Sequence, residues 1–90
     1  MPKYLIEREL PGAGKLTHAE LEAISKKSND TLMQLGPSIR WLHSYVAGDK
    51  IYCVYVAPNV DLVREHARKG GFPANLIVPI SNVIDPSTKE

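Results

Sequence analysis

The chain has 90 residues, enough for one domain that buries about 60% of its unfolded surface on folding. Its 11 basic and 10 acidic residues nearly cancel, which excludes the basic surface needed to bind nucleic acid or an anionic membrane. No apolar run approaches the about 18 residues of a membrane span, and a lone cysteine, Cys53, cannot form an intrachain disulfide. We therefore expect a single cytoplasmic domain over residues 1–90.

The first third of the chain is predicted to form a strand and a helix. Residues 3–9, KYLIERE, alternate crudely between apolar and polar residues, which favours a strand. Thr17 and Glu20 have the spacing of a capping box, which predicts a helix start. The stripe that faces the core is expected to recur at helical spacing over a helix of about 17 residues, which Gly36-Pro37 ends. Its members are Leu21, Ile24, Ser28, Leu32 and Leu35.

The middle of the chain carries the strongest hairpin signal. Residues 39–47 and 50–57 are rich in β-formers and flank the two-residue turn Gly48-Asp49. The sequence therefore predicts two antiparallel strands joined by a tight turn.

The last third is predicted to form a helix, a strand and a tail. Asn59 is the expected N-cap of the helix and Gly70 its C-terminal stop. Residues 76–84 resemble a strand, and Pro79 inside it requires a sheet edge or a bulge. Residues 85–90 are expected to be a flexible tail.

The predicted order is β-α-β-β-α-β, which is the ferredoxin-like arrangement of the α+β class. It implies a four-stranded antiparallel sheet, with the fourth strand at one edge beside the first and both helices on one face. An edge strand tolerates Pro79, so two independent signals agree.

Both faces of the predicted hairpin are apolar or aromatic. If the turn is Gly48-Asp49, one face pairs Val46 with Ile51, Ser44 with Cys53, and Leu42 with Tyr55. The other face then carries Trp41, His43, Tyr45, Tyr52, Val54 and Val56. Two helices cover only one face, and the sequence does not decide which. We expect the open face to pair with a second copy, giving a homodimer of the dimeric α/β barrel type.

His43 and Cys53 are two candidate site residues on the hairpin. His43 lies among aromatic side chains, and it is either a core residue or a ligand or base in a dimer cavity. Cys53 lies on the opposite face, where it is either a small buried hydrophobe or a nucleophile.

His66 is a further candidate, in the second helix. At about 100° per residue, His66 lies about 60° from Val63 and within the apolar arc, whereas Glu65 points away. We expect His66 to face the sheet or its rim, either as a functional residue or as a buried histidine bonded to a backbone carbonyl or to Ser44.

Glu7 and Arg8 point to opposite faces of the first strand, which is central in the predicted sheet. Either would be a costly buried charge unless it is paired. They are therefore either residues of a binding site or members of ion pairs.

The run DKIYCVYVAPNVDLVREHARKGG resembles the nickel-binding-protein-like family of small bacterial ferredoxin-like proteins, whose functions are mostly unknown. RWLHSYV (40–46) and KYLIERELPG at the start extend the similarity over essentially the whole chain. The resemblance implies a ferredoxin-like dimer, with Ni²⁺ or another divalent metal bound by histidines. The matching positions are His66 and His43, while Lys69 stands where metal-binding relatives carry a further histidine.

Three hypotheses follow. The first is a dimeric metal-binding protein without catalysis, which uses His43 and His66. The second is a dimeric α/β-barrel enzyme, similar to monooxygenases or isomerases, that acts on a small organic molecule, such as a small aromatic ligand, in an aromatic lumen with His43 as general base. The third is a structural or regulatory domain without a site. The residues expected to line a pocket are Glu7, Trp41, Tyr45, Tyr52 and Cys53.

Overall fold

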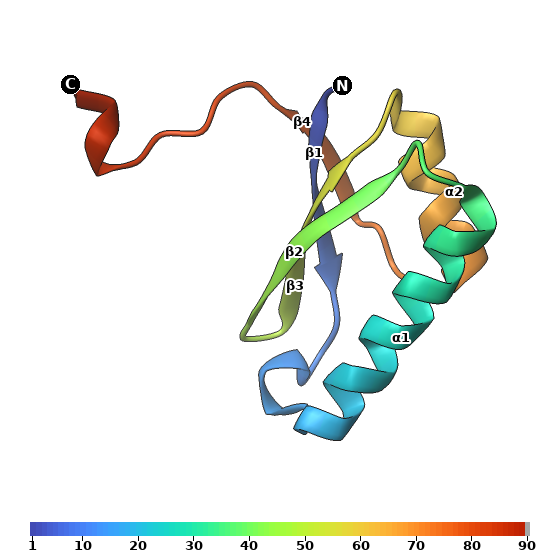
Figure 1. Cartoon of the computed structure of the whole chain (residues 1–90). Helices are drawn as coiled ribbons and strands as arrows, with labels where there is room; N and C mark the ends of the chain where they lie inside the picture. The colour runs from blue at the N-terminus through green and yellow to red at the C-terminus, as the bar shows by residue number, and fades with distance from the viewer. Residues whose placement is uncertain (90) are drawn as a thin grey trace.

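A computed structural model describes residues 1–89 and shows one four-stranded sheet with two helices (Figure 1). The elements are β1 (Lys3–Glu9), α1 (His18–Leu35), β2 (Arg40–Ala47), β3 (Lys50–Val56), α2 (Val60–Gly70) and β4 (Leu76–Ile80), with 3-10 turns at Ala13–Lys15 and Pro86–Lys89. The strands are antiparallel in the order β2-β3-β1-β4, and both helices lie on the same side of the sheet (Figure 1). The predicted ferredoxin-like α+β fold is confirmed.

The start of α1 agrees with the sequence prediction. The Thr17 hydroxyl accepts a hydrogen bond from the Glu20 amide at 3.2 Å, and the Glu20 carboxylate accepts one from the Thr17 amide at 3.0 Å. The reciprocal pair satisfies two backbone donors that a helix start leaves free.

The end of α2 differs from its prediction by one residue. Gly70 belongs to the helix and is buried, whereas Gly71 takes the left-handed conformation, with φ 69°, and stops it. Gly70 leaves room for the ring of Phe72, because a Cβ at this position would overlap that ring. The first glycine thus permits a close contact and the second ends the helix.

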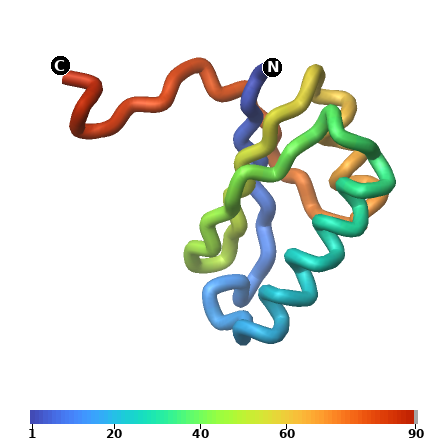
Figure 2. The backbone as a smooth tube through the Cα atoms, viewed as in Figure 1, coloured from blue at the N-terminus to red at the C-terminus, as the bar shows by residue number. Residues whose placement is uncertain are grey.

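The last strand is shorter than expected. β4 ends at Ile80 instead of residue 84, and Pro79 lies in this edge strand, opposite Tyr4. Beyond it the chain runs away from the sheet and ends in the 3-10 turn Pro86–Lys89 (Figure 2). Of the tail expected over residues 85–90, Glu90 lies outside the described residues.

A bulge in β2 corrects the predicted faces of the hairpin. Ser44 pairs with Cys53 as expected, but Trp41, instead of Leu42, pairs with Tyr55. The register shifts between Trp41 and His43, so Leu42 is the extra residue that a β-bulge inserts. Trp41 therefore leaves the face that carries His43 and joins the helix side, where its indole Nε1 donates to the Ser44 hydroxyl at 2.9 Å.

The core lies between the sheet and the helices. The largest fully buried side chains are Tyr55, Ile6, His66 and Val63. α2 buries apolar residues along one side, whereas the buried residues of α1 are polar, Ser28 and Thr31. The apolar residues of α1 that were expected to form its packed stripe, Leu21, Ile24, Leu32 and Leu35, are only half-buried. α1 therefore stands off the sheet along part of its length.

Candidate functional site

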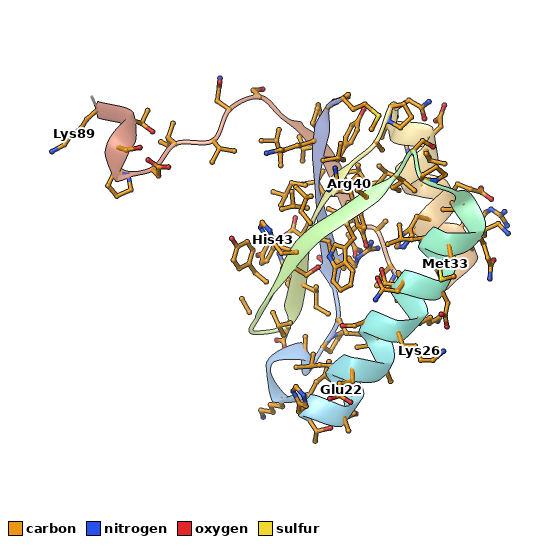
Figure 3. The ribbon with its side chains drawn as sticks, viewed as in Figure 1. Glu22, Lys26, Met33, Arg40, His43 and Lys89 are labelled. Atoms are coloured by element: carbon orange, nitrogen blue, oxygen red, sulfur yellow. The ribbon has the colours of Figure 1, made fainter. Side chains whose placement is uncertain are left out.

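The side of the sheet away from the helices carries the first group of predicted residues. His43 is exposed there, and its ring meets that of Tyr45 edge to face, with 5.1 Å between centroids (Figure 3). Tyr45 pairs with Tyr52, and Tyr52 pairs with Glu7, so these three form one row across the strands. We call this side of the sheet the open face.

Glu7 on the open face is paired. Its carboxylate lies 2.5 Å from the ammonium group of Lys50, and both side chains are partly exposed. The hydrogen bond to Glu7, with the attraction between the two charges, raises the pKa of Lys50. Of the two explanations open for Glu7, the structure shows the ion pair.

His66 is a residue of α2, on the other side of the sheet, and its side chain is fully buried. Its Nε2 is 3.3 Å from the hydroxyl of Ser28 on α1. The partner is therefore Ser28 and not Ser44, one of the partners expected from the sequence. The His66 ring stacks on Phe72 and contacts Tyr55, with centroid distances of 5.6 Å and 5.0 Å. Burial, and then the charge of Arg8, lower the pKa of His66 to about 4, so that the imidazole is neutral at pH 7.

Arg8 is the buried charge of this side. It is 4% exposed; its Nη1 donates to the Pro73 carbonyl at 2.6 Å and its Nε to the Cys53 sulfur at 3.4 Å. The guanidinium also lies 5.3 Å from the centroid of the Phe72 ring. Nη2 is buried without a hydrogen-bond partner, and among residues 1–89 no carboxylate forms an ion pair with Arg8.

The structure separates the residues that the sequence grouped into one pocket. Glu7, Tyr45 and Tyr52 share the open face, whereas Trp41 and Cys53 line a cavity on the helix side. The expected aromatic lumen therefore loses its tryptophan, because the bulge in β2 turns Trp41 to the other side.

The two predicted metal ligands are separated in the same way. His43 pairs with Val54 on the open face, while His66 packs from α2 against the opposite side. One sheet lies between them, so His43 and His66 of one chain cannot bind the same metal ion. Across residues 1–89 no three His, Cys, Asp or Glu side chains are grouped closely enough to hold a metal. A single copy of the chain thus does not fit a metal centre.

The group of residues that surrounds His66 on the helix side of the sheet was not identified from the sequence. These are Arg8, Ser28, Tyr55 and Phe72. The alternation of β1 was a usable signal, because it places Arg8 on the face of Tyr4 and Ile6. Ser28 interrupts the apolar positions of α1 and was counted among them. Nothing in the local sequence indicated that Phe72, which follows α2, folds back onto His66 and Arg8.

Within the described residues 1–89, no helix combines the length and the apolar character that a membrane crossing requires.

Comparison with known proteins identifies one family. Residues 4–80 match the model of the family described as nickel responsive protein SCO4226-like. Among solved structures, the chain is similar to the crystal structure of SCO4226 from Streptomyces coelicolor A3(2), with a TM-score of 0.75 and 14% identity. The likeness covers 91% of this chain and 99% of that chain, and at this identity it shows a shared fold. No curated protein sequence matches the chain.

Proposed function

Because this chain belongs to the SCO4226-like family of nickel responsive proteins, we propose that it is a homodimer that binds a divalent metal, Ni²⁺ first, without catalysis. The open face forms the dimer interface, and His43 from each copy contributes to the metal site. Its single cysteine, buried and free, suits a cytoplasmic protein. The observation that carries the proposal is a sheet face with large exposed apolar side chains and an exposed imidazole on it.

The open face has the character of an interface. Tyr45, Leu76 and Val78 are 60%, 51% and 40% exposed. An antiparallel sheet that faces water usually alternates towards polar residues on that side. Large apolar side chains gathered on such a face are typical of a surface that another molecule covers.

A second copy of the chain is the occupant that we propose. The Glu7–Lys50 pair neutralises two of the charges on the open face, which reduces repulsion when the same face meets itself. The C-terminal segment supports this choice, since it leaves the body of the domain with Val83 and Ile84 71% and 78% exposed (Figure 1). An extended arm with apolar side chains suits packing against a neighbouring copy.

The metal site requires both copies. One chain offers His43 on the open face but no group of three ligands within residues 1–89. A twofold axis through the open face would bring a second set of the same side chains to the first. Imidazole is a suitable ligand for Ni²⁺, and the description of the family names nickel.

Calorimetric titration with Ni²⁺ tests the proposal. We expect His43→Ala to remove the heat of Ni²⁺ binding seen with the unmodified protein, because the ligand is lost from both copies. His18→Ala is the matched control, since His18 is an exposed histidine beside Glu22 on α1. His66→Ala is expected to leave the metal stoichiometry unchanged. Identical heats in His43→Ala and the unmodified protein would refute the metal site.

A further inference from the structure

A cavity of about 380 Å³ lies between α1 and the sheet, on the side away from the open face. Its walls include Leu21 and Ile24 from α1, and Trp41, Ile51 and Tyr55 from the strands. Protein interiors are packed as densely as organic crystals, and voids larger than a water molecule are few. A space of this size is within the range of small-molecule sites.

Arg8 lines the cavity as an unpaired buried cation. A charge removed from water is costly unless an opposite charge or a full set of hydrogen bonds compensates it. The chain supplies Arg8 with a carbonyl and a sulfur, and leaves Nη2 without a partner. Among the described residues Nη2 therefore has no acceptor.

The remaining charge on the wall has the same sign. The Nζ of Lys27 lies 5.1 Å from the centroid of the Phe72 ring, and the guanidinium of Arg8 lies 5.3 Å from it. The described residues that line the cavity include these two cations and no Asp or Glu. The cavity therefore favours a negative ligand over a neutral or positive one.

The residues of the cavity wall limit the chemical class of the anion. Most of the lining is aliphatic or aromatic. Hydroxyl groups are provided by Ser25, Ser28, Ser44 and Tyr55, and those of Ser28 and Tyr55 lie 3.4 Å apart. One buried guanidinium edge suits a planar carboxylate, whereas a phosphate dianion would require more donors to compensate its charge. The apolar wall requires an apolar body attached to that carboxylate.

We propose that the cavity between α1 and the sheet is a binding site for a small organic acid, with its carboxylate beside the guanidinium of Arg8 and its apolar body against Ile24, Ile51 and Trp41. The site is separate from the open face and does not depend on the metal or on the dimer.

Trp41 provides the readout, because it is the single tryptophan of the chain and lies in the cavity wall. Benzoate, phenylacetate and hexanoate are titrated into the full-length protein while tryptophan fluorescence and the melting temperature are recorded. We expect at least one acid to shift both signals, and benzyl alcohol, the neutral counterpart of benzoate, to bind at least tenfold more weakly.

Two variants test the assigned contacts. Arg8→Met keeps a long side chain but removes the cation, and it should weaken binding of the acid at least tenfold. The matched control is Arg64→Met, because Arg64 is exposed on α2 and does not line the cavity. Ile24→Phe fills part of the cavity with Arg8 in place, and it should also weaken binding, with circular dichroism as the check of folding.

Several outcomes would overturn the proposal. These are no response to any of the three acids, equal affinity for benzyl alcohol, or undiminished binding in both cavity variants. Inorganic phosphate that binds through Arg8 while the organic acids do not would also overturn it, since it would show an anion site without an apolar ligand.

Discussion

The Nε2 atom of His66 and the hydroxyl of Ser28 lie 3.3 Å apart in a buried contact that joins α2 to α1. A neutral imidazole suits this place, because it can share one hydrogen bond with a hydroxyl and stack on Phe72 without bringing a charge into the core. The residue that the resemblance assigned to metal binding is thus a residue of the helix–helix contact in this chain.

This contact makes the stability of the fold depend on pH. The pKa of His66 falls from 6.5 to about 4 on folding, so between these values the unfolded chain binds more protons than the folded one. The contribution of His66 to the free energy of unfolding is therefore greatest above pH 6.5 and falls as the pH decreases. We expect His66 to account for a loss of about 2 kcal/mol between pH 7.5 and pH 5.

Urea unfolding at the two pH values measures this effect. His66→Gln does not titrate and should lose about 2 kcal/mol less than the unmodified protein over the same interval. His18→Gln, at an exposed position of α1, should behave as the unmodified protein does. The assignment would be wrong if His66→Gln kept the full pH dependence.

Replacement of Arg8 should stabilise the empty protein. Arg8→Met removes an unpaired buried charge and fills its place with an apolar chain, and we expect the free energy of unfolding to rise by about 1 kcal/mol in ligand-free buffer. Urea unfolding beside Arg64→Met, expected to stay within about 0.5 kcal/mol, provides the comparison. A loss of more than 1 kcal/mol in Arg8→Met would instead show that its bonds to Pro73 and Cys53 hold the fold together.

The order of the elements was predictable because it depends on local signals. The capping box at Thr17, the turn at Gly48 and the proline of the edge strand each act within a few residues. The bulge at Leu42 was not predictable, because strict alternation fits the same letters equally well. What decides it is tertiary: the bulge lets Trp41 pack against the core on the side that the helices cover.

The site was less predictable than the fold for a related reason. His66 was correctly placed on the inward arc of its helix, but its partner Ser28 is 38 residues away in sequence. The cavity arises because α1 stands off the sheet, which no periodicity in the sequence of α1 indicates. That His43 and His66 lie on opposite sides follows from strand register and helix packing together, and the hairpin alone does not determine it.

Gly70 tests how firmly Phe72 is held. In Gly70→Ala the new methyl group would lie 2.4 Å and 2.6 Å from two carbon atoms of the Phe72 ring. Alanine favours a helix by up to about 1 kcal/mol over glycine, but overpacking costs about 1–3 kcal/mol. Since the ring is stacked on His66, we expect a net loss of about 1 kcal/mol in urea unfolding, and little change in Lys69→Ala next to it. A gain in stability would show that the Phe72 ring moves aside freely.

The dimer interface can be tested by one charge placed on the open face. Leu76 is opposite Glu7 in the sheet, so Leu76→Lys gives the folded chain a favourable cross-strand pair. In a dimer built on this face the same lysine would be buried against the second copy, which is costly. We expect light scattering to give twice the 10.0 kDa chain mass for the unmodified protein and the mass of one chain for Leu76→Lys.

Met33→Lys is the matched control, because Met33 is 81% exposed on the outer side of α1 (Figure 3). It should keep the dimer mass and the heat of Ni²⁺ binding, whereas Leu76→Lys should lose both if two copies complete the metal site. A monomer in the unmodified protein would exclude the interface. A Leu76→Lys monomer that still binds Ni²⁺ with full heat would place the metal ligands within one chain and not between two.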